Sequence, residues 1–211
     1  MTASIVIHTD GSCLKNPEGP GGCAFILELA DGTVIECAQA SASTTNNRME
    51  MQAAINALQV LESVAYEGAD IELVSDSQYV VKGATEWIHG WKRRDWVNAA
   101  GESVANRDLW RQIDDLTFGK KISWKWVRGH AGHAYNEHVD KLASRAAREQ
   151  QAHYYEYASI EQMLDQARTN NPRRIQTTLL IDTDMSDDAI AQAVREQIAK
   201  SKGRSFRVRG M

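Results

Sequence analysis

The chain has 211 residues, of which 43% are hydrophobic and 25% are charged, and its net charge is -4 at pH 7. These values are ordinary for a folded globular protein and exclude a chain that is disordered over most of its length. The length suits one catalytic domain with an appended segment.

The N-terminal sequence MTASIVIHTD holds an apolar run of only three residues. Such a run is too short for a signal peptide or a transmembrane span, so we expect a cytoplasmic protein without membrane association. The three cysteines, Cys13, Cys23 and Cys37, form an odd set without the spacing of a metal site, and we expect free thiols.

Charge is unevenly placed along the chain. Residues 1–150 carry 15 basic and 20 acidic side chains, whereas residues 151–211 carry 9 basic and 8 acidic ones. An acidic protein is not an obvious partner for nucleic acid, because phosphates usually meet Lys and Arg. Binding to nucleic acid would therefore need bound cations and local basic patches.

Three β-rich runs come first in the chain and predict a meander of strands at residues 4–9, 23–29 and 33–40. The first run ends at Asp10-Gly11-Ser12, which reads locally as a turn. From Thr45 the apolar residues recur with a helical period. We expect a helix that has Thr45 or Asn46 as its cap and ends before Gly68.

The next part of the chain alternates strands with helices. A buried strand at 71–75 stops at Asp76, and Ser77 can cap a helix that continues to Trp91. A helix at 109–118, a strand at 122–127 and a helix at 136–149 follow. This order predicts an α/β domain with a five-stranded mixed sheet flanked by helices.

The composition changes near residue 150, where we place a boundary between a catalytic domain (1–150) and a C-terminal extension of unknown function (151–211). The extension reads as strand (174–182), helix (187–200) and strand (205–210), a pattern that suits a small βαβ unit. It is short for an independent domain.

The end of the extension is basic. Its last twelve residues contain no acid and include five basic side chains: Lys200, Lys202, Arg204, Arg207 and Arg209. Such a tail is either a nucleic-acid tether or merely a solvated end. If it is a tether, truncation after residue 150 should raise KM with little change in kcat.

Four acidic residues stand where the expected fold could bring them together. Asp10 and Asp76 follow predicted strands, at the strand ends where open α/β sheets collect ligands. Glu50 lies in the first turn of a predicted helix, and Asp140 lies on the last one. A carboxylate cluster without cysteine or paired histidine ligands prefers hard cations, which suit phosphoryl chemistry.

Each of these residues also has an ordinary structural interpretation. An Asp before Gly-Ser is typical of a turn, and an acidic residue beside a serine cap suits a helix N-terminus. Carboxylates on helices are usually solvated. Taken singly, none of the four residues indicates catalysis, so the surrounding sequence decides between the interpretations.

Four motifs occur in order and at suitable spacings: TDGSCLKNP at 9–17, TTNNRMEMQAA at 44–54, SDSQYV at 75–80 and VRGHAGHAYNEHVDKLA at 127–143. Together they resemble the bacterial type 1 ribonuclease H family over about residues 3–148. The resemblance implies a ribonuclease H-like fold. It also implies an endonuclease that cuts the RNA strand of RNA–DNA hybrids with two Mg²⁺ ions, or Mn²⁺, and leaves 5′-phosphate and 3′-hydroxyl ends.

The resemblance also assigns roles to residues. Asp10, Glu50, Asp76 and Asp140 match the metal-binding carboxylates. His130 matches the family histidine that assists proton transfer or product release, and histidine suits that task because it titrates near neutral pH. His133 looks like a structural neighbour. The positions that match the family's contacts to substrate are Cys13, Asn16, Thr45, Asn46, Asn47, Gln78, Trp91 and Asn136.

Two positions depart from the family pattern. Between Trp91 and Trp110 the family usually carries a lysine-rich protrusion that grips the DNA strand, whereas here only residues 92–94 are basic before the segment becomes nearly neutral. We therefore expect weaker hybrid affinity and a smaller salt dependence. An extra residue, Glu18, lies beside Asn16.

We expect Trp87 to pack in the core.

Two other functions compete with this one. A nuclease of the wider fold superfamily would act on DNA, but the TTNNRME and GHAGH motifs argue against it. A non-catalytic hybrid-binding module would not need all four carboxylates, and all four are present. We expect a monomer, and dimerisation through the extension stays open.

Overall fold

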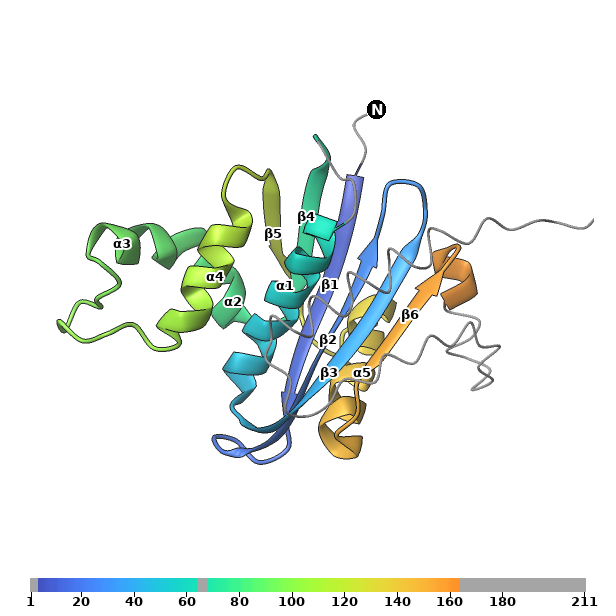
Figure 1. The fold of residues 1–211 in the computed structure, drawn as a ribbon, viewed down its shortest axis with the longest axis horizontal. Coiled ribbons are helices and arrows are strands. Elements are labelled where there is room, and N and C mark those ends of the chain that lie inside the picture. The colour runs from blue at the N-terminus through green and yellow to red at the C-terminus, as the bar shows by residue number, and fades with distance from the viewer. Residues whose placement is uncertain (1–3, 64–67, 164–211) are drawn as a thin grey trace, which may run out of the picture.

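The computed structural model describes residues 4–63 and 68–163. One mixed sheet runs through the molecule in the strand order β5-β4-β1-β2-β3-β6 (Figure 1). Its strands are β1 (Ser4–Cys13), β2 (Gly19–Glu28), β3 (Val34–Thr44), β4 (Asp70–Ser75), β5 (Ile122–Trp126) and β6 (His153–Tyr157). The described part therefore has the α/β fold that the sequence predicts.

The parallel pairing in the sheet positions two acidic residues. β1, β2 and β3 form the expected antiparallel meander, and β4 lies parallel to β1 on the other side. The parallel register ends with the pair Thr9 and Ser75. Asp10 follows Thr9 within β1, and Asp76 directly follows the end of β4 at Ser75. Both residues therefore lie at the same edge of the sheet.

The interpretation of Asp10 as a turn residue after a strand is wrong. β1 continues to Cys13, because its other edge stays paired with β2 from Asp10 opposite Ala24 to Cys13 opposite Gly21. The turn signal of Asp10-Gly11-Ser12 is local, and it is overridden by strand pairing.

In the described part of the chain the sheet also has six strands instead of the expected five. The additional strand, β6, pairs antiparallel with β3 at the sheet edge. Tyr154 and Tyr157 of β6 are buried, so the start of the expected extension packs on the sheet. The sheet thus extends past residue 150, whereas the predicted βαβ pattern at 174–210 lies outside the described residues.

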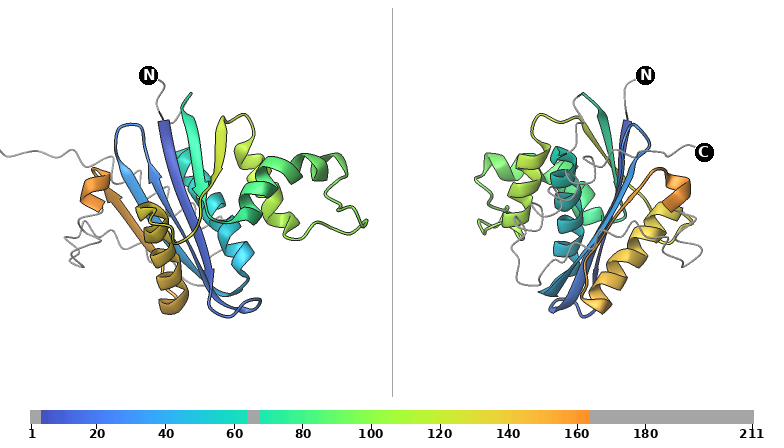
Figure 2. Two further views of the ribbon diagram at one scale, coloured as in Figure 1. Left: turned by 180° about the vertical axis from the view of Figure 1, so that it is seen from behind. Right: turned by 45° about the vertical axis from the view of Figure 1, so that its right-hand side comes forward.

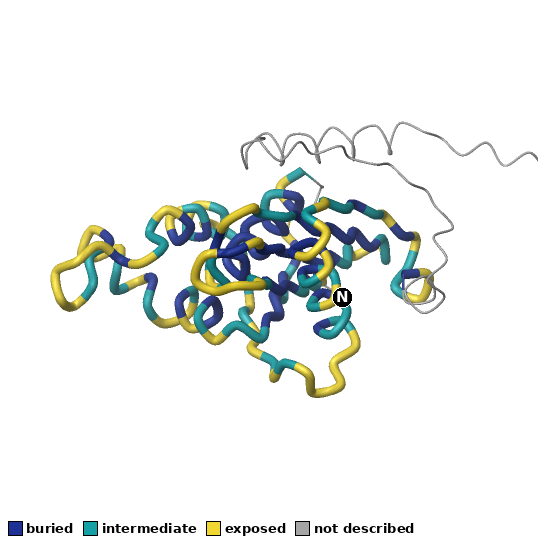
Figure 3. Tube along the Cα trace, turned by 90° about the horizontal axis from the view of Figure 1, so that it is seen from below, coloured by how far each residue is buried: buried dark blue, intermediate teal, exposed yellow. Residues whose placement is uncertain are grey.

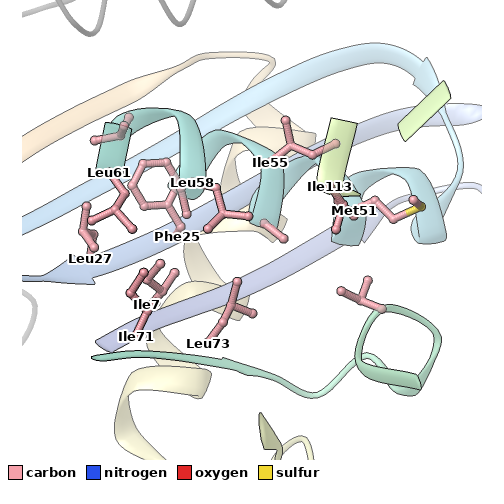
Figure 4. Close-up of a cluster of buried hydrophobic side chains, with 14 of the residues drawn as sticks. Ile7, Phe25, Leu27, Met51, Ile55, Leu58, Leu61, Ile71, Leu73 and Ile113 are labelled. Carbon is pink, nitrogen blue, oxygen red and sulfur yellow. The ribbon is translucent and has the colours of Figure 1, made fainter. Parts of the chain in front are cut away.

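Helices cover both faces of the sheet (Figure 2). α1 (Asn46–Ser63) and α4 (Arg107–Thr117) lie on one face, and α5 (Ala134–Glu149) lies on the other, over β1, β2 and β3. Figure 4 shows the main core, in which Phe25, Leu58 and other apolar side chains of α1 and the sheet interlock. Within the described residues, no helix is long and apolar enough to cross a membrane.

The segment after β4 is helical but not uniform. α2 (Gln78–Lys82) runs through one π-helical stretch (Gly83–Trp87) into α3 (Ile88–Arg93). A Cβ on Gly83 would collide with the ring of the fully buried Trp110, so glycine allows this close contact. Beyond α3 the chain forms a protrusion whose tip is exposed (Figure 3).

Candidate active site

Three of the four expected carboxylates meet at one edge of the sheet. Asp10, Glu50 and Asp76 each offer an oxygen, and these oxygens all lie within 4.8 Å of one another. They come from β1, from the first turns of α1 and from the residue after β4. Asp10 and Glu50 are only 5% and 6% exposed, so the cluster is largely withdrawn from water.

Gly11 allows Glu50 to approach Asp10. A Cβ on Gly11 would collide with the backbone of Glu50, so a larger residue would push α1 away from β1. In the sequence alone, Gly11 reads only as part of a turn. A glycine inside a strand is a signal for close approach of another backbone, and that signal identifies it.

The cluster is electrostatically unfavourable without a counter-charge. Burial raises the pKa of Asp10 to about 8, and the charges of Asp76 and Asp140 add to the shift. Burial, together with Asp10 and Asp76, also raises the pKa of Glu50 well above its ordinary value. The charge of Asp140 also raises the pKa of Asp10, so Asp140 belongs to the same electrostatic unit.

The residues of the cluster fit a hard divalent cation. Within residues 4–63 and 68–163, Glu50 Oε2 is buried without a hydrogen-bond partner, although a buried carboxylate oxygen normally has one. Grouped carboxylate oxygens are the ligands that Mg²⁺ and Mn²⁺ prefer. A cation there would satisfy Glu50 Oε2 and offset the charge that raises the pKa values.

Asp76 is held from α5. The Asn136 side-chain amide donates to Asp76 Oδ2 at 3.0 Å, and Asn136 itself is buried. A Cβ on Gly129 would lie 2.6 Å from Asp76 Oδ2, so glycine leaves room for the carboxylate. Asn136 therefore lies beside the cluster, in the place that the resemblance implies.

His130 lies at the solvent side of the cluster. Its Nδ1 is 4.0 Å from Asp140 Oδ2, and its side chain is 82% exposed. The residue has a positive φ of 53°, in the loop that precedes α5. His133 stands at the N-cap of α5 without a side-chain capping hydrogen bond.

The loop before α1 links two expected substrate residues to the carboxylates. Asn16 Oδ1 accepts a hydrogen bond from the backbone N–H of Asn46 at 3.2 Å. Asn46 Nδ2 in turn donates to Glu50 Oε1 at 3.4 Å. A polar path therefore runs from the β1–β2 turn to the carboxylate cluster.

The other expected contacts on these loops have different surroundings. Thr45 Oγ1 accepts from the N–H of Arg48, so Thr45 is the cap of α1. The Cys13 thiol donates to the carbonyl of Thr44 at 3.4 Å. Asn47 and Gln78 are exposed.

Trp91 lies away from these residues, in an aromatic row. Its ring centroid is 5.7 Å from that of Trp87 and 5.4 Å from that of Trp110. Trp87 also contacts Tyr79, but it is only partly buried and lies outside the main core, whereas Trp91 packs against that core. The structure therefore groups the carboxylates with Asn46 and Asn136, and it puts Trp91 at the base of the protrusion.

The fold and the acidic cluster together define an α/β protein with a candidate site for hard cations at one edge of a mixed sheet. The RNase H family matches residues 2–148. The chain is 51% identical over 143 residues to ribonuclease H of Shewanella loihica, covering 68% of this chain and 87% of that protein. It is 48% identical over 149 residues to ribonuclease H of Pseudomonas fluorescens, covering 71% and 95%.

The chain therefore belongs to the RNase H family, and it is a ribonuclease H enzyme of the bacterial type 1 kind. Among solved structures, LC9-RNase H1, a type 1 RNase H with the type 2 active-site motif, superposes with a TM-score of 0.62 at 33% identity, covering 75% of this chain and 77% of that one. LC11-RNase H1 in complex with an RNA/DNA hybrid has a TM-score of 0.54 at 18% identity, covering 69% and 98%, and shows the shared fold.

Proposed function

We propose that this enzyme hydrolyses the RNA strand of RNA–DNA hybrids and uses two divalent cations held by Asp10, Glu50, Asp76 and Asp140. The observation that carries the proposal is the cluster of buried carboxylates, with a partnerless Glu50 oxygen and raised pKa values of Asp10 and Glu50. Mg²⁺ is the expected ion, and Mn²⁺ has the same ligand preference.

When bound, the two cations would activate the attacking water and stabilise the leaving oxygen, and hydrolysis would leave 5′-phosphate and 3′-hydroxyl ends. Asn136 keeps one Asp76 oxygen in place through its amide hydrogen bond. His130, exposed and next to Asp140, can take up or deliver a proton between the site and solvent. In this proposal the carboxylates hold the cations, Asn136 orients Asp76, and His130 transfers protons.

The polar residues of the loops are proposed to recognise the hybrid. Asn16 and Asn46 face one another beside Glu50, while Asn47 and Gln78 are exposed near the ends of α1 and α2. Cys13 and Thr45 are proposed to contact the hybrid on the same side, and Trp91 is proposed to contact the DNA strand. Amide and backbone groups can bond the ribose 2′-hydroxyl, which distinguishes RNA from DNA.

Every candidate site residue falls within residues 1–150, so we propose this stretch as the catalytic unit and 151–211 as an extension that begins with the edge strand β6. We also propose a cytoplasmic monomer. Gel filtration coupled to light scattering tests the oligomeric state: a dimer that reverts to a monomer on truncation after residue 163 would assign dimerisation to the extension.

One cleavage assay tests the activity. RNA–DNA, RNA–RNA and DNA–DNA duplexes of one sequence, each with a labelled strand, are incubated with Mg²⁺ or with chelator. The proposal expects cleavage of the RNA in the hybrid only, and only with metal. Cleavage of DNA would support the wider nuclease superfamily, and binding without cleavage would support a hybrid-binding module.

The Asp10→Asn variant tests the metal assignment in the same assay. It should lose cleavage while it keeps hybrid binding, because a ligand oxygen is replaced by an amide nitrogen. Asp108→Asn is the matched control, since Asp108 pairs with Arg48 outside the cluster, and it should retain cleavage. Full activity of Asp10→Asn would refute the metal assignment.

A further inference from the structure

The indole of Trp126 contacts the backbone of an expected metal ligand. Trp126 is the last residue of β5, and its Nε1 donates to the main-chain carbonyl of Asp76 at 2.9 Å. The register of the sheet puts Trp126 beside Ser75, the residue before Asp76. The edge strand is thereby joined directly to the site.

This hydrogen bond lies where the chain changes from strand to helix. The Ser75 carbonyl accepts from Val127 N at 3.1 Å, and the Ser77 carbonyl accepts from Val81 N at 3.1 Å. The Asp76 carbonyl lies between them and receives the indole. Because the carbonyl carbon and Cβ are both bonded to the same Cα, fixing the carbonyl restricts the backbone rotation that would swing the carboxylate.

Core packing explains the neighbours of Trp126 better than Trp126 itself. Ile122 and Trp124, at alternate positions of β5, pack against the main core. Trp126 continues this row past the core and stays 45% exposed. The indole N–H of this side chain donates to the Asp76 carbonyl.

Asp76 is therefore held at two points from two elements. Trp126 of β5 holds its carbonyl, and Asn136 of α5 holds its carboxylate. Partners that orient the ligands of a metal ion commonly change metal affinity 10- to 100-fold when they are removed. A rigidly held Asp76 keeps its oxygen near those of Asp10 and Glu50 before the ion binds.

We infer that Trp126 is a positioning residue that acts through the Asp76 backbone to raise the affinity of the site for divalent cations. The inference rests on the proposed function and adds a residue from the β5 edge strand to it.

The test compares two conservative variants of the full chain. Trp126→Phe keeps an aromatic ring but removes the N–H donor, whereas Trp124→Phe makes the same change two residues away, on a side chain that packs against the core. The measurements are the Mg²⁺ dissociation constant by titration calorimetry, the Mg²⁺ dependence of kcat, KM for the hybrid, and the melting temperature.

Trp126→Phe should weaken Mg²⁺ binding about tenfold, the lower end of the range for orienting partners, and should raise the Mg²⁺ concentration needed for half-maximal kcat to the same extent. Its KM at saturating Mg²⁺ should match that of the unaltered chain. Trp124→Phe should leave the Mg²⁺ dissociation constant unchanged, even if its melting temperature falls.

Unchanged Mg²⁺ affinity in Trp126→Phe would overturn the inference. A rise in KM alone would also overturn it, since Trp126 would then contact nucleic acid. If Trp126→Phe does not fold, Trp126→Met is judged by the same ratio of Mg²⁺ dissociation constants. An unaltered chain that does not cleave hybrids with Mg²⁺ would reject the proposed function instead, so the two failures are distinguishable.

Discussion

The side-chain amide of Asn136 donates to Asp76 Oδ2 at 3.0 Å and ties the first turn of α5 to the residue after β4. Asn136→Ala should lower kcat at limiting Mg²⁺ by about 10- to 100-fold, because the carboxylate loses its orienting partner. Steady-state kinetics across Mg²⁺ concentrations checks this, and an unchanged Mg²⁺ dependence in a folded variant would contradict it.

The carboxylate cluster should make the metal-free protein less stable as pH rises. The folded pKa of Asp10 is raised to about 8, so the fold favours the protonated carboxyl. The stabilisation of the fold by the protonated Asp10 carboxyl is fully present below the unfolded pKa near 4. It is lost as pH rises toward 8. Denaturant unfolding in chelator should therefore show falling stability between pH 5 and pH 8, and Mg²⁺ should reduce the fall.

Asp10→Asn should remove much of this pH dependence. At pH 8 in chelator, the free energy of unfolding of Asp10→Asn should be larger than that of the unaltered chain by at least about 1.4 kcal/mol, which is the equivalent of one pKa unit. Asp108→Asn is the control, because Arg48 lowers the pKa of Asp108 and its loss should give no such gain. Parallel pH profiles for the unaltered chain and Asp10→Asn would contradict the prediction.

The protrusion should give hybrid binding a weak dependence on salt. Lys92 is already paired with Asp114 at 2.8 Å, and Arg94 Nε donates to the Val97 carbonyl, so part of the basic charge is engaged within the protein. Replacing the exposed Ala99 and Ala100 by lysine should steepen the log–log salt slope by about 0.9 for each new phosphate contact. Equal slopes for this variant, a double serine control and the unaltered chain would rule the idea out.

Truncation should separate the role of β6 from that of the basic tail. Ending the chain after residue 150 removes the buried Tyr154 and Tyr157, so unfolding stability should fall by about 3 kcal/mol or more, as for other buried aromatic deletions. Ending it after residue 163 keeps β6 and removes the tail. If the tail is a tether, the second truncation should raise KM with little change in kcat, and an unchanged KM would exclude it.

Much of the fold follows from local sequence. The β-rich apolar runs of β2 and β3, the helical period after Thr45 and the short apolar run before Asp76 each predict their element, because these signals lie in the local sequence itself. The family assignment also follows from sequence, since four motifs carry it without any coordinate.

The positions that the sequence misjudged depend on partners distant in the chain. Asp10 resembles a turn residue until β2 pairs with it, and β6 is recognised as a sixth strand only when β3 provides an edge. Propensity is local, whereas strand pairing and burial are decided by the whole sheet.

By itself, then, the sequence determined the motifs and the enzyme family, and it identified the four carboxylates as candidates for the site. Only the tertiary structure decided that oxygens of Asp10, Glu50 and Asp76 lie within 4.8 Å of one another, that Glu50 Oε2 has no hydrogen-bond partner among the described residues, and that Trp126 donates to the Asp76 carbonyl. The physical reason is that a raised pKa or a hydrogen bond depends on distance and burial, which arise only when the strands and helices pack.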